Sequence, residues 1–271
     1  MQSVFQKISA FFMSIIAFFA GLFGLNKKPA DPAPEEPTMI TEPVEITVMT
    51  FNIQHFENIN TGLIDIEAYA GYIRESGASV VGLNEVFEDQ LAELAETLGW
   101  ESFFACGCDF GGRQYGNGIV SSLPLLEAQA VTIPDPEVQS YDGYYETRAL
   151  IACTVEIDGK ELHILCTHFG LNPDEAENGV NTVLAYMQNE RQILMGDFNL
   201  RPEDPLLDPI RSRMCDTAPL LGENCLTFPA DAPDRKLDYI FLSADLTAVS
   251  ADIPPLVLSD HRPYRCTVRF Y

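Results

Sequence analysis

Apolar residues along this chain alternate between short β-branched runs and stretches with helical spacing. Strands are predicted at 45–53, 78–86, 117–125, 193–195, 236–243 and 262–270, and helices at 65–77, 88–100 and 175–190. Residues 147–169 predict a hairpin, because two apolar runs flank Asp158-Gly159, a dipeptide typical of two-residue turns. Helices between strands, together with an antiparallel hairpin, predict an α/β protein with mixed sheets and one domain from residue 44 onward.

Polar side chains stand where the predicted strands begin or end. They are Asn52, Glu85, His168, Asp197, Asn199, Asp238, Asp260 and His261. In layered α/β proteins, such residues from distant segments gather at one edge of the sheets, where ligands bind. We therefore expect them to form one site, although each also has a structural alternative as a turn cap, a surface charge or a satisfied core histidine.

The segment "ILMGDFN" at 193–199 illustrates both alternatives. Asp197 and Asn199 alternate with Phe198, so an extended chain projects them to the same side. Side by side at the end of a buried strand, their oxygens could hold a hard cation or a water molecule. They could equally form an Asx turn that ends the strand.

The chemistry of the set favours phosphoryl transfer to water. Its carboxylates and carboxamides are hard oxygen donors without a Cys–His cluster, a composition that suits Mg²⁺ or Mn²⁺. Such a cation polarises a phosphoryl oxygen and steadies the leaving oxygen. His168 and His261 could orient water or stabilise charge on phosphorus, and Asp238 could fix the His261 tautomer. The sequence therefore predicts hydrolysis of a phosphate ester.

The charge of the chain is strongly acidic. The sequence has 271 residues with 16 basic and 40 acidic side chains, a formal net charge of −24. The only charged residues before position 29 are three lysines; without them, 13 basic and 40 acidic residues remain, a net charge of −27. Such a body repels polyanions at long range, which argues against a processive nuclease.

The N-terminus is predicted to be separate from the domain. Residues 8–25 are uncharged and apolar, close to the minimum length that spans a bilayer. We expect residues 1–28 to be a signal-anchor or transmembrane segment in preference to a cleaved signal, and residues 29–43 to be a proline-rich linker. A membrane-anchored or secreted protein follows, with the extracytoplasmic side favoured, and the domain is expected to be a monomer.

The polar motifs also resemble those of a known family. "TFNI", "LNEV", "YGNGIVSS", "THFG", "GDFN", "KLDYIF" and "SDHRP" are similar, in order, to the motifs of the endonuclease/exonuclease/phosphatase superfamily. The resemblance runs from about Val44 to Tyr271. It implies a four-layer α/β sandwich with two facing mixed sheets, and an Mg²⁺-dependent phosphoesterase site between the sheet edges.

The resemblance also implies a role for each residue. The implied metal residues are Asn52, Glu85 and Asp260. The implied catalytic residues are His168, Asp197, Asn199, Asp238 and His261. Substrate contacts are expected from Arg148, Asn117 and Tyr115, with Arg113 and His55 as further candidates. The chain departs from the family at Asn84, where a glutamine is more common, which shortens a side chain next to Glu85.

Three functions remain open from the sequence. The first is a metal-dependent hydrolase of phosphate mono- or diesters, acting on a lipid, a small molecule or nucleic acid. The second is an anchored or secreted nuclease that degrades DNA or RNA. The third is a non-catalytic binding module on the same fold, which the completeness of the polar set disfavours.

Overall fold

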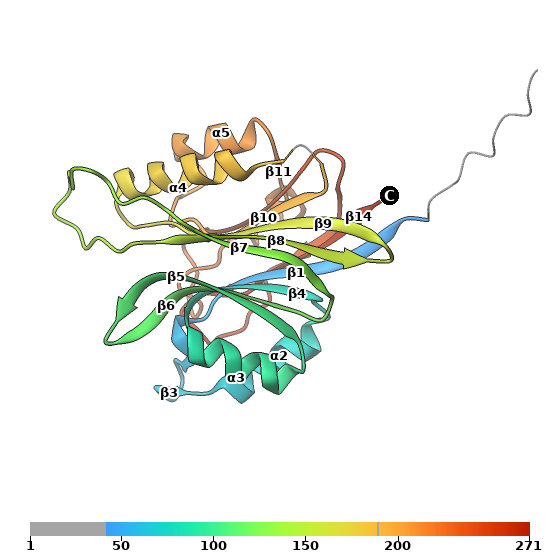
Figure 1. The fold of residues 1–271 in the computed structure, drawn as a ribbon, viewed down its shortest axis with the longest axis horizontal. Helices are drawn as coiled ribbons and strands as arrows, with labels where there is room; N and C mark the ends of the chain where they lie inside the picture. The colour runs from blue at the N-terminus through green and yellow to red at the C-terminus, as the bar shows by residue number, and fades with distance from the viewer. Residues whose placement is uncertain (1–41, 189) are drawn as a thin grey trace, which may run out of the picture. The chain divides into compact units, whose positions relative to one another are not determined.

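The computed structural model describes residues 42–188 and 190–271. Glu42–Tyr271 form one compact unit, in which two β-sheets face each other and helices cover their outer faces (Figure 1). The predicted four-layer α/β sandwich is confirmed. The predicted N-terminal segment at 1–28 and most of the linker at 29–43 lie outside the described residues. Among those described, no helix is both long and apolar enough to cross a membrane.

The first sheet contains six strands, with β1 and β4 parallel at its centre. In spatial order its strands are β13 (Thr247–Asp252), β14 (Tyr264–Phe270), β1 (Val44–Asn52), β4 (Val80–Phe87), β6 (Arg113–Ser121) and β5 (Glu101–Phe110). The second sheet also has six strands, with β9 and β10 parallel. Its order is β11 (Cys215–Asp216), β12 (Asp238–Leu242), β10 (Gln192–Asp197), β9 (Lys160–His168), β8 (Ala149–Ile157) and β7 (Leu125–Thr132).

The helices begin and end where the sequence supplies capping residues. The main helices are α2 (Ile66–Ser76), α3 (Glu88–Leu98) and α4 (Pro173–Tyr186), followed by the short α5 (Asp208–Arg211). Asp65 caps α2 by accepting a hydrogen bond from the Ala68 amide, and Gly77 ends it in the left-handed conformation. Asn172 and Glu175 form a capping box at the start of α4. Short elements complete the chain: η1 (Gln54–Phe56), β2 (Glu57–Asn58), β3 (Leu63–Ile64), η2 (Pro205–Leu207) and η3 (Ala218–Leu220).

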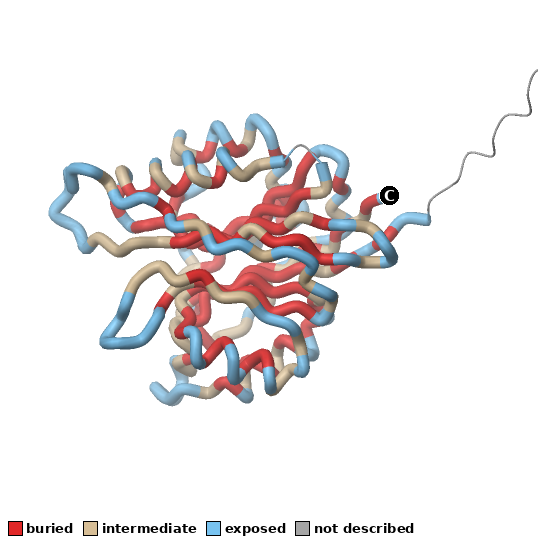
Figure 2. The backbone as a smooth tube through the Cα atoms, in the orientation of Figure 1, coloured by how far each residue is buried: buried red, intermediate tan, exposed pale blue. Residues whose placement is uncertain are grey.

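Three apolar clusters hold the layers together. One fills the space between the sheets, with Val48, Ile164 and Ile240 among its members. The second packs α2 and α3 on the first sheet, and the third packs α4 and α5 on the second. Buried segments concentrate in the central strands and the inner sides of the helices (Figure 2). This layering explains the continuous apolar runs in the central strands, which are buried on both faces.

Two glycines let the sheets and strands approach closely. A Cβ on Gly82 of β4 would lie 2.7 Å from Cys166 Sγ of the facing sheet, and a Cβ on Gly196 would lie 1.9 Å from the Thr167 carbonyl oxygen. Gly196 also has φ 147°, which side-chain-bearing residues rarely adopt. Gly196 lies directly before Asp197, and Gly82 lies three residues before Glu85, so both glycines are close to residues of the predicted site.

Three strands that the apolar pattern does not predict lie at sheet edges. They are β5, β7 and β13, each of which pairs with only one neighbouring strand. Their side chains are largely exposed or half-buried, so they carry no continuous apolar run. The pattern also places the strand at 117–125 too late, because β6 begins at Arg113 with exposed residues.

Close packing at Gly82 makes a stability prediction. Gly82→Ala would push a methyl group against Cys166 Sγ and should destabilise the protein by about 1–3 kcal/mol, the usual penalty for overpacking. Gly71→Ala is the matched control, because Gly71 lies in α2 with open space around it and alanine is the better helix former by about 1 kcal/mol. Urea unfolding followed by circular dichroism measures both, and equal stabilities of the two variants would contradict the close approach.

Candidate active site

The polar residues predicted from the strand ends lie together between the two sheets. Asn52 ends β1 and Glu85 lies near the end of β4 in the first sheet, while His168 ends β9 and Asp197 ends β10 in the second. Asp238 begins β12 and pairs with Asp197 across the antiparallel ladder. The end of each sheet thus contributes side chains to one cluster, and most of this cluster is buried.

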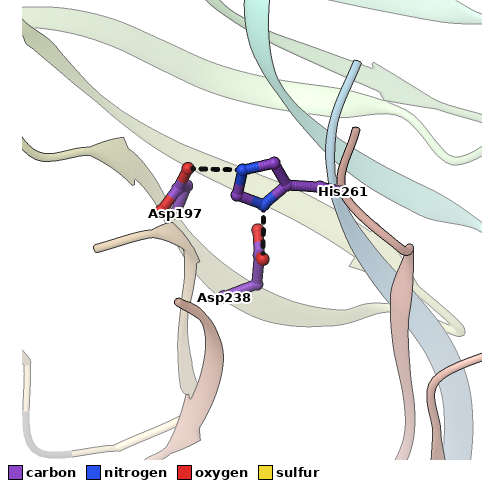
Figure 3. A group of neighbouring side chains, drawn as sticks. All are labelled: Asp197, Asp238 and His261. Atoms are coloured by element: carbon purple, nitrogen blue, oxygen red, sulfur yellow. Dashed lines mark hydrogen bonds and ion pairs between the residues drawn. The ribbon is translucent and has the colours of Figure 1, made fainter. Parts of the chain in front are cut away.

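His261 connects two buried carboxylates (Figure 3). Its Nδ1 lies 2.8 Å from Asp238 Oδ2, within hydrogen-bond distance, and its Nε2 lies 3.6 Å from Asp197 Oδ2. The ring of Phe228 packs against the imidazole with a centroid distance of 4.8 Å. The hydrogen bond expected between Asp238 and His261 is therefore present, and the imidazole is held with Nε2 toward Asp197.

Burial and charge set the protonation of this group. Burial lowers the pKa of His261, but the Asp238 and Asp197 carboxylates outweigh it and raise the pKa well above the usual histidine value. Burial raises the pKa of Asp197, against the opposing effect of the His261 charge. His261 is therefore a cation at neutral pH, next to a carboxylate that is more basic than an exposed aspartate.

Asp197 serves both of the roles that the sequence left open. Its Oδ1 accepts a hydrogen bond from the Asn199 amide at 2.9 Å, which makes an Asx turn at the end of β10. Its Oδ2 accepts from Asn52 Nδ2 at 3.1 Å and lies toward both histidines. Asn199 itself adopts φ 52°, a conformation that asparagine tolerates better than most residues. The turn and the site therefore use different oxygens of one carboxylate.

His168 is held as a neutral ring. Burial lowers its pKa well below the usual value, and the Arg148 and His261 charges lower it further. Arg148 Nη1 donates to Nδ1 at 3.0 Å, so the ring proton is placed on Nε2. Nε2 lies 3.1 Å from Asn199 Nδ2, which also donates to the Phe169 carbonyl oxygen at 3.0 Å. Both polar neighbours of the ring, Arg148 and Asn199, are hydrogen-bond donors. With its proton on Nε2, the ring faces another donor in Asn199, and an anionic oxygen that accepted from both would relieve this contact.

Glu85 is turned toward the site by an irregularity in β4. The pairing between β4 and β6 shifts between Asn84 and Val86, so Glu85 is an extra residue in its strand, and its φ is 60°. Such bulges change the direction of a side chain and are frequent next to active sites. Asn52 Nδ2 donates to Glu85 Oε1 at 2.9 Å, and the same nitrogen donates to Asp197. One carboxamide therefore sets the positions of two carboxylates.

The donors at Glu85 and Asp260 fit a hard divalent cation. Burial raises the pKa of Asp260, the His261 charge lowers it, and the neighbouring Glu85 carboxylate raises it again. The two carboxylates are thus close enough to repel each other, and a bound cation would relieve the repulsion. Asn52 uses its nitrogen to orient Glu85, while its oxygen accepts a hydrogen bond from the Gln54 amide at 3.2 Å.

Another candidate for a metal site consists of Asp197, Asp238 and His261. One possible ligand atom from each of these residues lies within 4.8 Å of the others. In this group, however, Nδ1 of His261 is engaged with Asp238 at 2.8 Å. The two oxygens of Asp197 already accept hydrogen bonds from the Asn199 amide and from Asn52 Nδ2. The Glu85 and Asp260 oxygens therefore suit a cation better than this group does.

The predicted substrate residues lie around the cluster in different environments. Asn117 is buried, and it donates to the Ala149 carbonyl oxygen at 2.7 Å and accepts from Asn84 at 2.9 Å, so both of its polar atoms are engaged. Arg148 Nη1 lies 2.7 Å from Glu146 Oε1 and also contacts His168 Nδ1. Burial raises the pKa of Tyr115, and the adjacent Glu85 raises it further.

The two further candidates lie at the periphery of the cluster. His55 lies 3.5 Å from Glu57 and packs near Phe87. Arg113 stacks over the Phe87 ring at 3.8 Å.

The contacts of two supporting residues are not evident in the sequence. Asn84 donates to the Thr167 carbonyl oxygen at 3.0 Å and accepts from the Asp197 amide at 3.0 Å, so it joins the sheets directly beneath the site. Lys236 is buried, and its Nζ donates to the Asp238 carbonyl oxygen at 2.9 Å. The sequence singled out Asn84 only for its shorter side chain next to Glu85, and it gave no signal for Lys236 beyond its place two residues before Asp238.

Comparison with known proteins identifies the family. The model of the Endonuclease/Exonuclease/phosphatase family matches residues 49–261, which include every predicted site residue. The chain belongs to this family. No curated protein matches the sequence.

Solved structures of the same fold share little sequence with this family member. An endonuclease/exonuclease/phosphatase from Beutenbergia cavernae is 23% identical, with a TM-score of 0.69, over 83% of this chain and 72% of that one. Mannosyl-6-phosphatase Bt3783 from Bacteroides thetaiotaomicron is 18% identical, with a TM-score of 0.68, over 82% and 99%. TDP2 from D. rerio, complexed with a single-strand DNA product, is 20% identical, with a TM-score of 0.65, over 83% and 98%.

The two histidines should show opposite protonation states. At about pH 6, below the ordinary histidine pKa of about 6.5, His168 should remain neutral. At about pH 7.5, above that value, His261 should remain charged, because Asp238 and Asp197 raise its pKa. NMR of ¹⁵N-labelled imidazoles measures both, with His168→Gln and His261→Gln used to assign the signals. A neutral His261 at pH 7.5 would contradict the proposed electrostatics.

Proposed function

We propose that the protein is a divalent-cation-dependent phosphoesterase that hydrolyses phosphate mono- or diesters. The observation that supports this most strongly is the convergence of His261 and His168 on one buried oxygen of Asp197, at 3.6 and 3.7 Å. One imidazole is cationic and the other neutral, and the carboxylate between them has a raised pKa. Such a group can move a proton and stabilise charge at the same place.

Asp197 is proposed to accept the proton of the attacking water. A general base works best when its pKa is near the working pH. Burial raises the pKa of Asp197 toward that range. Asn52 holds Oδ2 in place by a hydrogen bond at 3.1 Å. The Asx turn holds the other oxygen, so the carboxylate has little freedom to rotate.

The phosphoryl group is proposed to lie between the two histidines. His261 Nε2–H can donate to a phosphoryl oxygen, and the Asp238 carboxylate keeps the imidazole charged and oriented. His168 Nε2–H and Asn199 Nδ2–H provide two further donors. Glu85 and Asp260 are proposed to hold the cation, with Asn52 orienting Glu85. A bound Mg²⁺ or Mn²⁺ would polarise a phosphoryl oxygen and stabilise the leaving oxygen.

The substrate is proposed to be a small or surface-presented phosphate ester. A net charge of −27 over residues 29–271 opposes the binding of long polyanions. Nuclease activity is the alternative, because TDP2 of the same fold binds a single-strand DNA product. The complete set of acid, base and donor groups disfavours a non-catalytic binding module. The apolar stretch at residues 8–25 supports an anchored or exported protein. Its extracytoplasmic location and its monomeric state are further parts of the proposal.

Cation dependence is the first prediction of this function. Hydrolysis of bis-p-nitrophenyl phosphate should require Mg²⁺ or Mn²⁺ and stop when EDTA is added. Glu85→Gln and Asp260→Asn should raise the cation concentration that gives half-maximal activity, because each removes an anionic ligand. Glu93→Gln, an exposed change on α3, is the matched control and should leave that concentration unchanged. Full activity in EDTA would refute the cation assignment.

The Asp238–His261 pair makes a second prediction. His261→Ala removes a donor to developing charge and should lower kcat by about 10²–10³-fold. Asp238→Asn should lower kcat less, because the imidazole remains. The double variant should resemble His261→Ala, since both changes act through one ring. Asp208→Asn, an exposed change, is the control. Two losses that multiply as independent factors would show that the pair does not act as a unit.

A further inference from the structure

Exposed hydrophobic side chains concentrate at the end of the body where the site lies. Eight of the twelve large hydrophobic side chains that are exposed in the described residues lie on loops that leave this end. Five of them define an apolar rim: Phe110, Val138, Tyr141, Tyr144 and Leu171. The β2–β3 hairpin carries the other three, Ile59, Leu63 and Ile64. In Figures 1 and 2 these loops project at the left, with the β5–β6 hairpin and the β7–β8 loop on either side of the gap between the sheets.

One side of the apolar rim is continuous with the site. The β5–β6 hairpin carries Phe110 at its tip, 54% exposed, where Gly111 and Gly112 adopt positive φ and turn the chain. The Phe110 ring lies 5.7 Å from the Tyr115 ring, and Tyr115 is a neighbour of Glu85. A molecule that contacts Phe110 therefore lies next to the proposed cation site.

On the other side of the apolar rim, hydrogen bonds fix the backbone of the β7–β8 loop, while the hydrophobic side chains are exposed to solvent. Asn172 Nδ2 donates to the Tyr144 carbonyl oxygen at 3.0 Å, and the Glu146 amide donates to Glu175 at 3.0 Å. Tyr144 is nevertheless 65% exposed, and so is Leu171, three residues after His168. Hydrogen bonds that fix the loop leave its hydrophobic side chains in water, which is unfavourable unless a partner covers them.

The charge of the same loops restricts the partner. Their exposed charges are mostly acidic: Asp109, Asp135, Glu137 and Asp142. The one exposed arginine of the β5–β6 hairpin, Arg113, is already paired with Asp89. Polyanions and anionic membranes are therefore repelled. Aromatic faces and carboxylates together attract ammonium groups, which zwitterionic phospholipids carry on their head groups.

We propose that the apolar rim docks the protein on a zwitterionic phospholipid surface, so that head-group phosphoesters are presented to the site. The identity of the substrate rests on the proposed function, whereas the docking itself does not. Tyrosine and phenylalanine with adjacent leucine and valine are the side chains expected at the boundary between head groups and acyl chains. The apolar rim flanks the site on two sides, so docking would place the site against the head groups.

Tryptophan quenching by brominated lipid tests the docking independently of hydrolysis. The full chain contains one tryptophan, Trp100, which sets the background emission. Phe110→Trp and Tyr144→Trp place a reporter on the apolar rim and keep its aromatic character. Leu126→Trp and Val249→Trp are matched controls, because both positions are exposed but lie away from the site. Each variant is mixed with vesicles of dibrominated phosphatidylcholine, and its emission is compared with that in unbrominated vesicles.

The added emission should be largely lost at positions 110 and 144 and retained at 126 and 249. Replacing half of the lipid by phosphatidylglycerol should weaken the quenching, because the rim loops are acidic. Equal quenching at all four positions, or none at any, would overturn the proposal, and the second result would point to a protein partner or a soluble substrate. Quenching without hydrolysis of either bis-p-nitrophenyl phosphate or the monoester p-nitrophenyl phosphate would instead refute the proposed function and leave the docking intact.

Discussion

The site depends on the carboxamide of Asn84, which joins the two sheets at the point where their strands end. It donates to the Thr167 carbonyl oxygen and accepts from the Asp197 amide, and it also bonds Asn117 within its own sheet. An amide that is fully buried must satisfy all of these groups, so the two sheets can meet in only one register here. Gly82 allows the two sheets to approach, and Gly196 allows β10 to lie close to β9 within the second sheet. The relative positions of His261, Asp197 and Glu85 depend on this register, because the two sheets contribute different residues to the site.

Within this frame, one carboxylate and two imidazoles have different charges because their surroundings differ. His261 has two carboxylates near its ring, which outweigh burial and keep it cationic. His168 is kept neutral by burial and, in addition, by the guanidinium of Arg148 on Nδ1. Asp197 lies between the two imidazoles. Burial raises the pKa of its carboxyl group, and the His261 charge lowers it. The same side-chain types thus provide a proton acceptor and two kinds of donor. The separate pair, Glu85 and Asp260, carries the negative charge that a cation would balance.

Much of the fold and most of the residues of the candidate site were predictable from the sequence, for a definite physical reason. Central strands are buried on both faces, so their apolar runs are continuous, and the polar residues at their ends stand out. The edge strands β5, β7 and β13 lack that burial and therefore that signal. The bulge that turns Glu85 and the bonds of Asn84 depend on contacts with residues far away in the chain. Local patterns contain no information about such partners.

The central claim is that Glu85 and Asp260 hold the cation while Asp197, His261 and Asp238 handle the proton and the phosphoryl group. The most direct measurement is a crystal structure of the protein soaked in Mn²⁺ and phosphate, with the ion located by its anomalous scattering. The account predicts an anomalous peak within coordination distance of Glu85 and Asp260, with phosphate between His261 and His168. A peak between Asp197, Asp238 and His261, with His261 acting as a ligand, would contradict it.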